Sequence, residues 1–441
     1  MQNQNLLQAN IKNTYFKYLL AASGSAMITS IYSTVDAAVV GHYAGPLGSA
    51  ALAVIMPIWN IIYSIGLLVG IGGSVAYSYY KGQNKAEKAN AYFTLSLDLA
   101  ILVSVLCWLG IIFFDDQLLR LFGADDTLLP LAKEYMLPIK FVIPVYPFTH
   151  MLSAFLRNDN EPELATKAVL IGGIFNVFGD LFFVFVLDMG MFGAGLATAL
   201  GGLISVLVML SHFFGKKNSI HLEKIYGTLH KSRIVTINGF SSFISDLAMG
   251  IVAMLFNRQV MLHFGADALA VYGVIVQVAG FVQCTSYGAG QAAQPLISTN
   301  FGAGRYDRVK ETNKYGLRTA VVMGIVWTAL FLLIPNAFTH LYMKPTESVL
   351  AIAPDIMRIY GISFLLLPLN IYATYYFPSV MRAKSAMIIS LGRGLVLCGV
   401  LIFVLPAVFG KEAIWWVMPI TEVIVVVYAL LSMRRATKNN Q

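Results

Sequence analysis

Two aspartates stand inside long apolar stretches of this 441-residue chain, where ionisable side chains are unexpected. Asp36 lies in the first stretch, within residues 31–45, and Asp180 lies in the fifth, within residues 175–183. A carboxylate at membrane depth costs several kcal/mol and faces a protein interior or a water-filled cavity rather than lipid. Two such groups in one hydrophobic chain predict a site that handles cations, as in an ion-coupled transporter.

The depths of the two aspartates can be compared along their helices. Asp36 lies about 28 Å beyond Lys17, and Asp180 lies about 20 Å beyond Lys167, at about 1.5 Å of rise per residue. The two lysines mark the cytoplasmic ends of the first and fifth stretches. We therefore expect both carboxyl groups in the outer half of the membrane, where they can meet.

Two neutral polar residues complete the predicted site. Asn176 precedes Asp180 by four residues and so shares its helix face, and Thr198 brings a hydroxyl from the sixth stretch. Two neighbouring carboxylates in a low-dielectric site do not both ionise cheaply, so one holds a proton or both bind a cation. We expect cation coupling at Asp36, Asn176, Asp180 and Thr198, with Na⁺ a candidate ion at Asp36, Asn176 and Asp180. The alternative is a structural hydrogen bond that joins the first and fifth stretches.

The elements that must position these residues are membrane helices. The chain is 58% hydrophobic and 12% charged, whereas a soluble domain is about 25% charged. A spanning helix needs about 20 mostly apolar residues, and long continuous runs are unlike the short alternating strands of a membrane barrel. We predict an all-α membrane protein with twelve transmembrane helices in two pseudo-symmetric six-helix lobes. The helices are centred near residues 28, 65, 104, 143, 176, 203, 248, 284, 324, 364, 397 and 423.

The net charge of +8 is distributed over alternate loops rather than over one nucleic-acid-binding face. Basic residues gather at 81–88, 216–233, 305–314, 382–384 and 434–438, whereas the intervening loops carry few of them. This is the positive-inside bias, which predicts that both termini are cytoplasmic. We expect lipid and small-molecule partners, no nucleic acid, and a monomer.

The sequence shows no sign of enzyme chemistry. It has no metal-ligand cluster, nucleophile triad or phosphate loop, so we expect a protein that is not an enzyme and uses no cofactor beyond a coupling ion, H⁺ or Na⁺. The three cysteines all lie in apolar spans and imply no disulfide framework.

A weak internal repeat divides the chain. Residues 52–54 and 269–271 both read Leu-Ala-Val, at an offset of 217, and glycine-rich ends of the second and eighth stretches both lead into basic loops. Six spans per half give both halves the same orientation, as in a transporter whose cavity lies between two bundles. We predict lobes at residues 1–220 and 221–441, joined by a polar cytoplasmic connector.

Polar residues of the second half are candidates for a substrate cavity. They are Asp246, Arg393, Gln277 and Asn370. An Arg–Asp pair in a helix bundle would neutralise both charges and could be purely structural. Amide groups and Glu422 are expected to join helices by hydrogen bonds.

Several segments resemble signatures of the multidrug and toxic compound extrusion (MATE) family. Residues 35–45 resemble its first-span signature, and residues 176–180 with 193–198 are similar to its fifth and sixth spans. Residues 291–304 are similar to the end of its eighth span, and residues 155–162 resemble the loop after span four in its DinF-like bacterial branch. The resemblance covers nearly the whole chain.

This resemblance implies two six-helix lobes around a V-shaped cavity, in a bacterial cytoplasmic (inner) membrane. It implies export of organic cations against H⁺ or Na⁺, with the cation site at Asp36, Asn176, Asp180 and Thr198. Cation binding there is thought to alter the first helix and release drug. Two departures stand out: the first span has Gly24 rather than a proline as its flexible point, and Met249 stands where other branches carry a glutamate.

The sequence therefore predicts a cation-coupled multidrug efflux antiporter that exports amphipathic, cationic compounds by alternating access. One alternative is a lipid-linked-sugar flippase or polysaccharide exporter of the same superfamily. Such proteins tend to have more cationic cavities, whereas the spans here contain only Arg393, Arg258 and Lys140 as basic residues. Another alternative is a membrane receptor or scaffold, which would need a ligand or partner domain.

Overall fold

The structure is a computed structural model that describes residues 4–343 and 345–438, and within them it contains helices and turns but no strand. The first half contains α1 (Gln4–Gln8), α2 (Ile11–Gly82), α3 (Ala86–Leu121), α4 (Leu128–Val142), α5 (Tyr146–Asn158), α6 (Pro162–Asp180) and α7 (Gly190–Leu210). The second half contains α8 (Thr228–Phe264), α9 (Ala266–Gly302), α10 (Tyr306–Leu333), α11 (Pro335–Tyr342), α12 (Glu347–Gly361), α13 (Leu367–Ser379), α14 (Ala383–Leu391), α15 (Leu397–Phe409) and α16 (Val417–Lys438). Short 3-10 or π segments join several of them: η1 (Ile143–Val145), η2 (Leu181–Val186), η3 (Ser211–Phe214), η4 (Ile362–Leu365), η5 (Gly392–Val396) and η6 (Lys411–Trp416).

The prediction of an all-α membrane protein is confirmed. Among the described residues, 11 helices are long and apolar enough to cross a membrane, beginning with Leu47–Gly82 and ending with Lys411–Arg435. The remaining predicted span, residues 11–44, is helical as well. Its serines, threonines and Asp36 make it less apolar than the other spans.

The long helix α2 is in fact two helices that meet at Gly45 without a loop. Gly45 adopts φ 63° and ψ −151°, which breaks the helical path between residues 44 and 46. A positive φ with extended ψ is accessible to glycine at little cost and strained for residues with a Cβ. The glycine therefore lets the first two spans connect in one residue.

By contacts between residues, the chain forms two compact units. The first unit comprises Gly24–Phe243 together with the N-terminal residues up to Ala9, and the second comprises Asn10–Ser23 and the residues from Ile244 onward. Both α2 and α8 are therefore divided between the units. The division in α2 falls at Gly24, the residue that the sequence marks as the flexible point of the first span.

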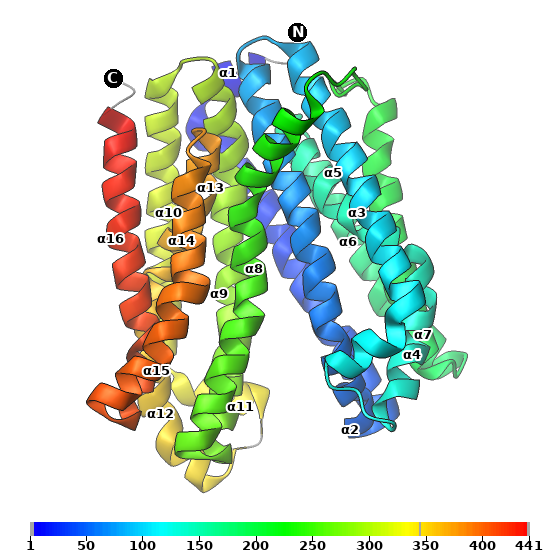
Figure 1. Ribbon diagram of the computed structural model, residues 1–441, viewed down its shortest axis with the longest axis vertical. Coiled ribbons are helices and arrows are strands. Elements are labelled where there is room, and N and C mark those ends of the chain that lie inside the picture. The colour runs from blue at the N-terminus through cyan, green and yellow to red at the C-terminus, as the bar shows by residue number, and fades with distance from the viewer. Residues whose placement is uncertain (1–3, 344, 439–441) are drawn as a thin grey trace. The chain divides into compact units, whose positions relative to one another are not determined.

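Each unit is a bundle of membrane helices. In the second unit, α9, α10, α14 and α16 run roughly parallel to one another (Figure 1). Residues with apolar side chains also cover much of each outer surface, as bundles in lipid require. Five polar residues of the candidate sites are buried inside the bundles: Asp36, Asn176, Asp180, Asn370 and Glu422.

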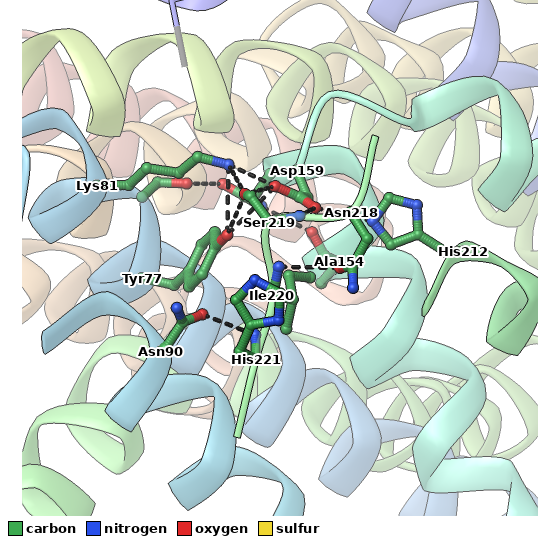
Figure 2. Close-up of polar contacts among 12 residues, drawn as sticks. Tyr77, Lys81, Asn90, Ala154, Asp159, His212, Asn218, Ser219, Ile220 and His221 are labelled. Carbon is green, nitrogen blue, oxygen red and sulfur yellow. Dashed lines mark hydrogen bonds and ion pairs between the residues drawn. The ribbon is translucent and has the colours of Figure 1, made fainter. Parts of the chain in front are cut away.

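The connector between α7 and α8 is fixed to the first unit by a buried ion-pair network. The carboxyl group of Asp159 accepts hydrogen bonds from Lys81 Nζ (2.5 Å), His212 Nε2 (2.8 Å) and the backbone N–H of Ser219 (2.9 Å), as Figure 2 shows. The backbone N–H of His221 donates to Asn90 Oδ1 (3.1 Å). These bonds hold residues 219–221 of the connector against α2, α3 and α5.

The charge of Asp159 is well stabilised in this network. Burial by itself would raise the pKa of the Asp159 carboxyl, but the hydrogen bond from His212 and the charge and hydrogen bond of Lys81 lower that pKa to about 2. Because Asp159 is 1% exposed and Lys81 is 7% exposed, the ion pair is a buried one, for which loss of either partner is costly.

Candidate functional site

Both aspartates singled out in the sequence are buried in the first unit. Asp180 ends α6 and is 0% exposed, and Asp36 lies in the first part of α2 at 9% exposed. The two carboxyl groups are close enough to interact electrostatically. Two residues far apart in the sequence thus lie buried in the same unit, and their role in cation coupling stays a prediction.

A chain of hydrogen bonds leads to Asp36. Asn176 Nδ2 donates to Thr198 Oγ1 (3.1 Å), Thr198 Oγ1 lies 3.3 Å from the Tyr135 hydroxyl, and that hydroxyl donates to Asp36 Oδ2 (2.8 Å). Since Tyr135 uses its proton on Asp36, the Thr198 hydroxyl donates to Tyr135. All donors therefore point toward Asp36, an arrangement that stabilises negative charge on its carboxyl group.

Glycines let the three helices of the site approach closely. A Cβ on Gly172 of α6 would lie 2.4 Å from the carbonyl oxygen of Gly201 on α7, and a Cβ on Gly195 would lie 2.0 Å from the carbonyl oxygen of Tyr135 on α4. Small residues of this kind bring backbones together in membrane bundles. This packing places Asn176 and Tyr135 within hydrogen-bond reach of Thr198.

Four oxygen atoms in the site fit a cation. Asp36 Oδ1, Asn176 Oδ1 and both carboxyl oxygens of Asp180 are buried, and within the described part of the chain they have no hydrogen-bond partner. Buried carboxylate and amide oxygens without donors are the ligands that hard cations prefer. The described residues contain no group of three or more His, Cys, Asp or Glu side chains placed to hold a metal ion. Asp36, Asn176 and Asp180 thus offer buried oxygen ligands within the first unit.

The polar residues predicted for a substrate cavity divide into two groups. Arg393 Nε donates to Glu422 Oε1 (2.6 Å), and Asn370 Nδ2 donates to Glu422 Oε2 (2.6 Å). The ion-pair partner of Arg393 is therefore Glu422 rather than an aspartate. Asp246 accepts a hydrogen bond from the Tyr287 hydroxyl (3.2 Å), and Gln277 is exposed.

A cavity inside the second unit is lined by Arg393 and Glu422 but not by Asp246, Gln277 or Asn370. Met249, the residue that departs from the glutamate of other branches, also lines it. Most of the remaining lining residues are apolar or aromatic. The structure thus joins Arg393 and Asn370 through Glu422, places Arg393 and Glu422 at the cavity, and leaves Gln277 apart.

Sequence reasoning missed two tyrosines of the first site. Tyr135 bridges Asp36 and Thr198, and the Tyr146 hydroxyl donates to the backbone carbonyl of Thr198 (3.0 Å). The signal that could have found them is their place in an apolar span, because a buried tyrosine hydroxyl needs a hydrogen-bond partner.

The sequence model of the MatE family matches residues 21–182 and 241–404, which is most of the chain and includes Asp36, Asn176, Asp180 and Arg393. The chain belongs to the MatE family of MATE transporters. This membership confirms the resemblance found in the sequence and makes the protein a membrane transporter rather than an enzyme.

Relatives and solved structures match this chain over nearly all of its length. The multidrug export protein MepA of Staphylococcus saprophyticus is 24% identical over 426 residues, which cover 95% of this chain and 94% of that protein. MepA of Staphylococcus aureus is 22% identical over the same shares. A structure titled as an outward-facing conformation of a multidrug resistance MATE family transporter matches with a TM-score of 0.91 at 18% identity, covering 100% of this chain and 99% of that one. A structure of MATE in the bent conformation matches with a TM-score of 0.89 at 19% identity over the same shares.

Proposed function

We propose that this MATE transporter is a multidrug efflux antiporter that exports amphipathic organic cations by alternating access, driven by entry of H⁺ or Na⁺. The observation that carries the proposal is the pair of buried carboxyl groups, Asp36 and Asp180, with partnerless oxygens in one bundle. The names of the MepA relatives, which describe multidrug export, support the choice of cargo.

Asp36 and Asp180 have different roles in this proposal. Asp36 receives a directed hydrogen bond from Tyr135 and so keeps a favourable environment for its charge. Asp180 has no donor among the described residues, so its charge is the more costly of the two and depends on a cation. A cation that enters the site therefore neutralises Asp180 and shields its repulsion with Asp36.

The position of Asp36 links cation binding to movement. It lies on the part of α2 between Gly24 and Gly45, two glycines that allow the backbone to bend on either side of it. Loading the site changes the charge that faces this segment. We propose that the segment responds by changing its path, which alters the affinity for drug.

The test is dye efflux from proteoliposomes under an imposed pH gradient and, in separate vesicles, an imposed Na⁺ gradient. Asp36→Asn and Asp180→Asn are each expected to abolish gradient-driven efflux while the protein is still expressed and folded. Asp98→Asn, which changes an exposed aspartate on α3 of the same unit, is the matched control and should retain efflux. Unchanged efflux in Asp36→Asn would remove this site from the coupling mechanism.

Three further proposals concern the orientation in the membrane, the boundaries of the lobes and the oligomeric state. We propose that both termini face the cytoplasm of a bacterial cell, that residues 1–220 and 221–441 act as the two lobes, and that a monomer suffices for transport. Labelling of single cysteines introduced at residues 84 and 305, both in basic loops, from either side of the membrane would test the orientation.

A further inference from the structure

The two units carry opposite charges at corresponding places. In the first unit, α6 ends at Asp180 and passes directly into the π segment η2. In the second unit, α14 passes directly into the π segment η5, which contains Arg393. Both π segments interrupt the penultimate span of their half of the repeat. π segments within helices are frequent at functional sites, and here an acid directly precedes one of them and a base lies within the other.

The hydrogen bonds among Arg393, Glu422 and Asn370 leave N–H donors of Arg393 unused, whereas the acceptor left without a partner, Asn370 Oδ1, belongs to a residue that does not line the cavity. Glu422 has both carboxyl oxygens occupied, one by Arg393 Nε and the other by Asn370 Nδ2. A guanidinium group has five N–H donors, and Nε is the only side-chain nitrogen of Arg393 that makes a hydrogen bond within the described residues. The N–H groups on its two terminal nitrogens are therefore available. The ion pair of Arg393 and Glu422 has no net charge. The unused N–H donors of Arg393 nevertheless favour a ligand that carries a hydrogen-bond acceptor.

Local packing holds Arg393 at the cavity wall. Ser390, one turn before it, accepts a hydrogen bond from Ser245 on α8 (2.9 Å), and a Cβ on Gly394 would lie 2.5 Å from the Cβ of Ala248 on the same helix. The close approach of η5 and α8 therefore requires the glycine. Arg393 is 12% exposed, so its guanidinium group is largely withdrawn from solvent and its hydrogen bonds are correspondingly strong.

The rest of the cavity suits an aromatic or aliphatic body. Its wall includes Tyr272, Tyr360, Phe364 and two methionines, Met249 and Met418. Methionine side chains adapt to ligands of different shape, and apolar pockets with a few polar groups are the usual form of a small-molecule site. A ligand that matches this wall has a flat apolar group and one anionic oxygen-bearing group.

We propose that the cavity of the second unit binds amphipathic carboxylates, including the carboxylate of zwitterions, with the anionic group on the terminal nitrogens of Arg393. The guanidinium fork matches the two oxygens of a carboxylate. The buried Glu422 holds Arg393 in position and balances its charge while no ligand is bound. This inference rests on the proposed export function for its biological meaning, and it adds a class of ligand that a cation exporter would not otherwise accept.

The experiment measures binding to the purified full-length protein in detergent, without any ion gradient, by isothermal titration. The probes share one ring system and differ in the polar group: 1-naphthaleneacetate, 1-naphthaleneacetamide and 2-(1-naphthyl)ethylamine. We expect the carboxylate to bind at least about tenfold more tightly than the amide or the amine, as one charge-assisted hydrogen-bonded contact provides. Equal binding of the three probes, or a preference for the amine, would overturn the proposal. Stronger binding of 1-naphthyl phosphate than of the carboxylate would overturn the carboxylate assignment.

Two variants separate a direct contact from a structural role. Arg393→Gln with Glu422→Gln removes both charges, so that no buried charge is left alone, and should abolish the preference for carboxylate while the amide still binds. Glu422→Gln alone keeps the guanidinium group and removes its competing anion, so it should strengthen carboxylate binding. A carboxylate preference that survives in the double variant would contradict the assignment.

The outcomes also separate this proposal from the one on coupling. The binding measurement uses no ion gradient, and the cavity is lined entirely by residues of the second unit, whereas Asp36 belongs to the first. Gradient-driven efflux by Asp36→Asn would refute the coupling proposal and leave the carboxylate proposal unaffected. Equal binding of the carboxylate and the amide would refute the carboxylate proposal and leave the coupling proposal unaffected.

Discussion

Replacing Asp159 by asparagine should release the connector between α7 and α8 from the first unit. The folded-state pKa of Asp159 is about 2 against an ordinary 3.8. At about 1.4 kcal/mol per pKa unit, the network stabilises the charged carboxyl by about 2.5 kcal/mol. The substitution also leaves Lys81, which is 7% exposed, without its carboxylate, and breaking a buried pair in this way costs about 3–5 kcal/mol in other proteins.

The assay is trypsin cleavage within the connector, which contains Lys216, Lys217 and Lys224. If local opening is fast compared with cleavage, the rate follows the population of the open form. A loss of about 2.5 kcal/mol then predicts cleavage about 60-fold faster in Asp159→Asn than in the unchanged protein. Asp307→Asn, which changes an exposed carboxyl group at the start of α10, is the control and should be cleaved at the original rate.

A second variant distinguishes loss of the ion pair from general damage. Lys81→Met combined with Asp159→Asn removes both buried charges, so part of the resistance to cleavage should return relative to Asp159→Asn alone. Equal cleavage of Asp159→Asn and the unchanged protein would refute the reasoning. So would a double variant that is cleaved faster than Asp159→Asn.

The contribution of Asp159 should also depend on pH in a defined direction. Its pKa is lowered by folding, so its stabilisation is complete above the unfolded value of 3.8 and is lost as the pH falls toward the folded value of about 2. Thermal unfolding in detergent should therefore show a constant difference between the unchanged protein and Asp159→Asn from pH 8 to 5, and a shrinking difference below about pH 4. An undiminished difference at pH 3 would contradict the assignment of this pKa.

Two further predictions concern the first site. Tyr135→Phe removes the donor that competes with a cation for Asp36 Oδ2. We therefore expect the apparent affinity for the coupling cation to rise by about tenfold, the contribution of one hydrogen bond to a charged group. Efflux measured against cation concentration gives this affinity, and a weaker affinity in Tyr135→Phe would contradict the prediction. Gly172→Ala places a Cβ 2.4 Å from the carbonyl oxygen of Gly201, so it should separate α6 from α7 and lower the free energy of unfolding by about 1–3 kcal/mol. Gly110→Ala, where a Cβ meets nothing within 4 Å, is its control in thermal unfolding and should be neutral or slightly stabilising.

Much of the first site could be predicted from the sequence because the constraint on it is local. An aspartate in an apolar membrane helix costs free energy wherever the helix packs, so the presence of Asp36 and Asp180 in such helices is enough to predict a buried cation site. Helical periodicity then adds Asn176 to the face of Asp180. The tyrosines could not be ranked in this way, since an aromatic residue in a membrane span is common and only its hydroxyl partner gives it meaning.

In the second site, the partner of Arg393 could not be predicted from the sequence. The sequence supplies Arg393, Asp246 and Glu422 in different spans, and each acid would satisfy the base equally well by charge. The structure selects Glu422, whose carboxyl group accepts a hydrogen bond from Arg393 Nε, and it brings η5 close to α8 at Gly394. Gln277, predicted for the cavity, lies on an exposed face of α9 instead.

The sequence by itself determined that this chain crosses a membrane as helices, that it carries acids where lipid does not tolerate them, and that it belongs with the MATE transporters. The first two follow from the cost of placing a given side chain or a bare peptide group in hydrocarbon, which depends on the segment alone. The third follows from the resemblance of several segments to signatures of that family. Only the tertiary structure decided which polar groups meet: Tyr135 with Asp36, Glu422 with Arg393, and Asp159 with the connector. Those choices depend on how helices rotate and approach one another, and contacts between residues far apart in the chain fix that geometry.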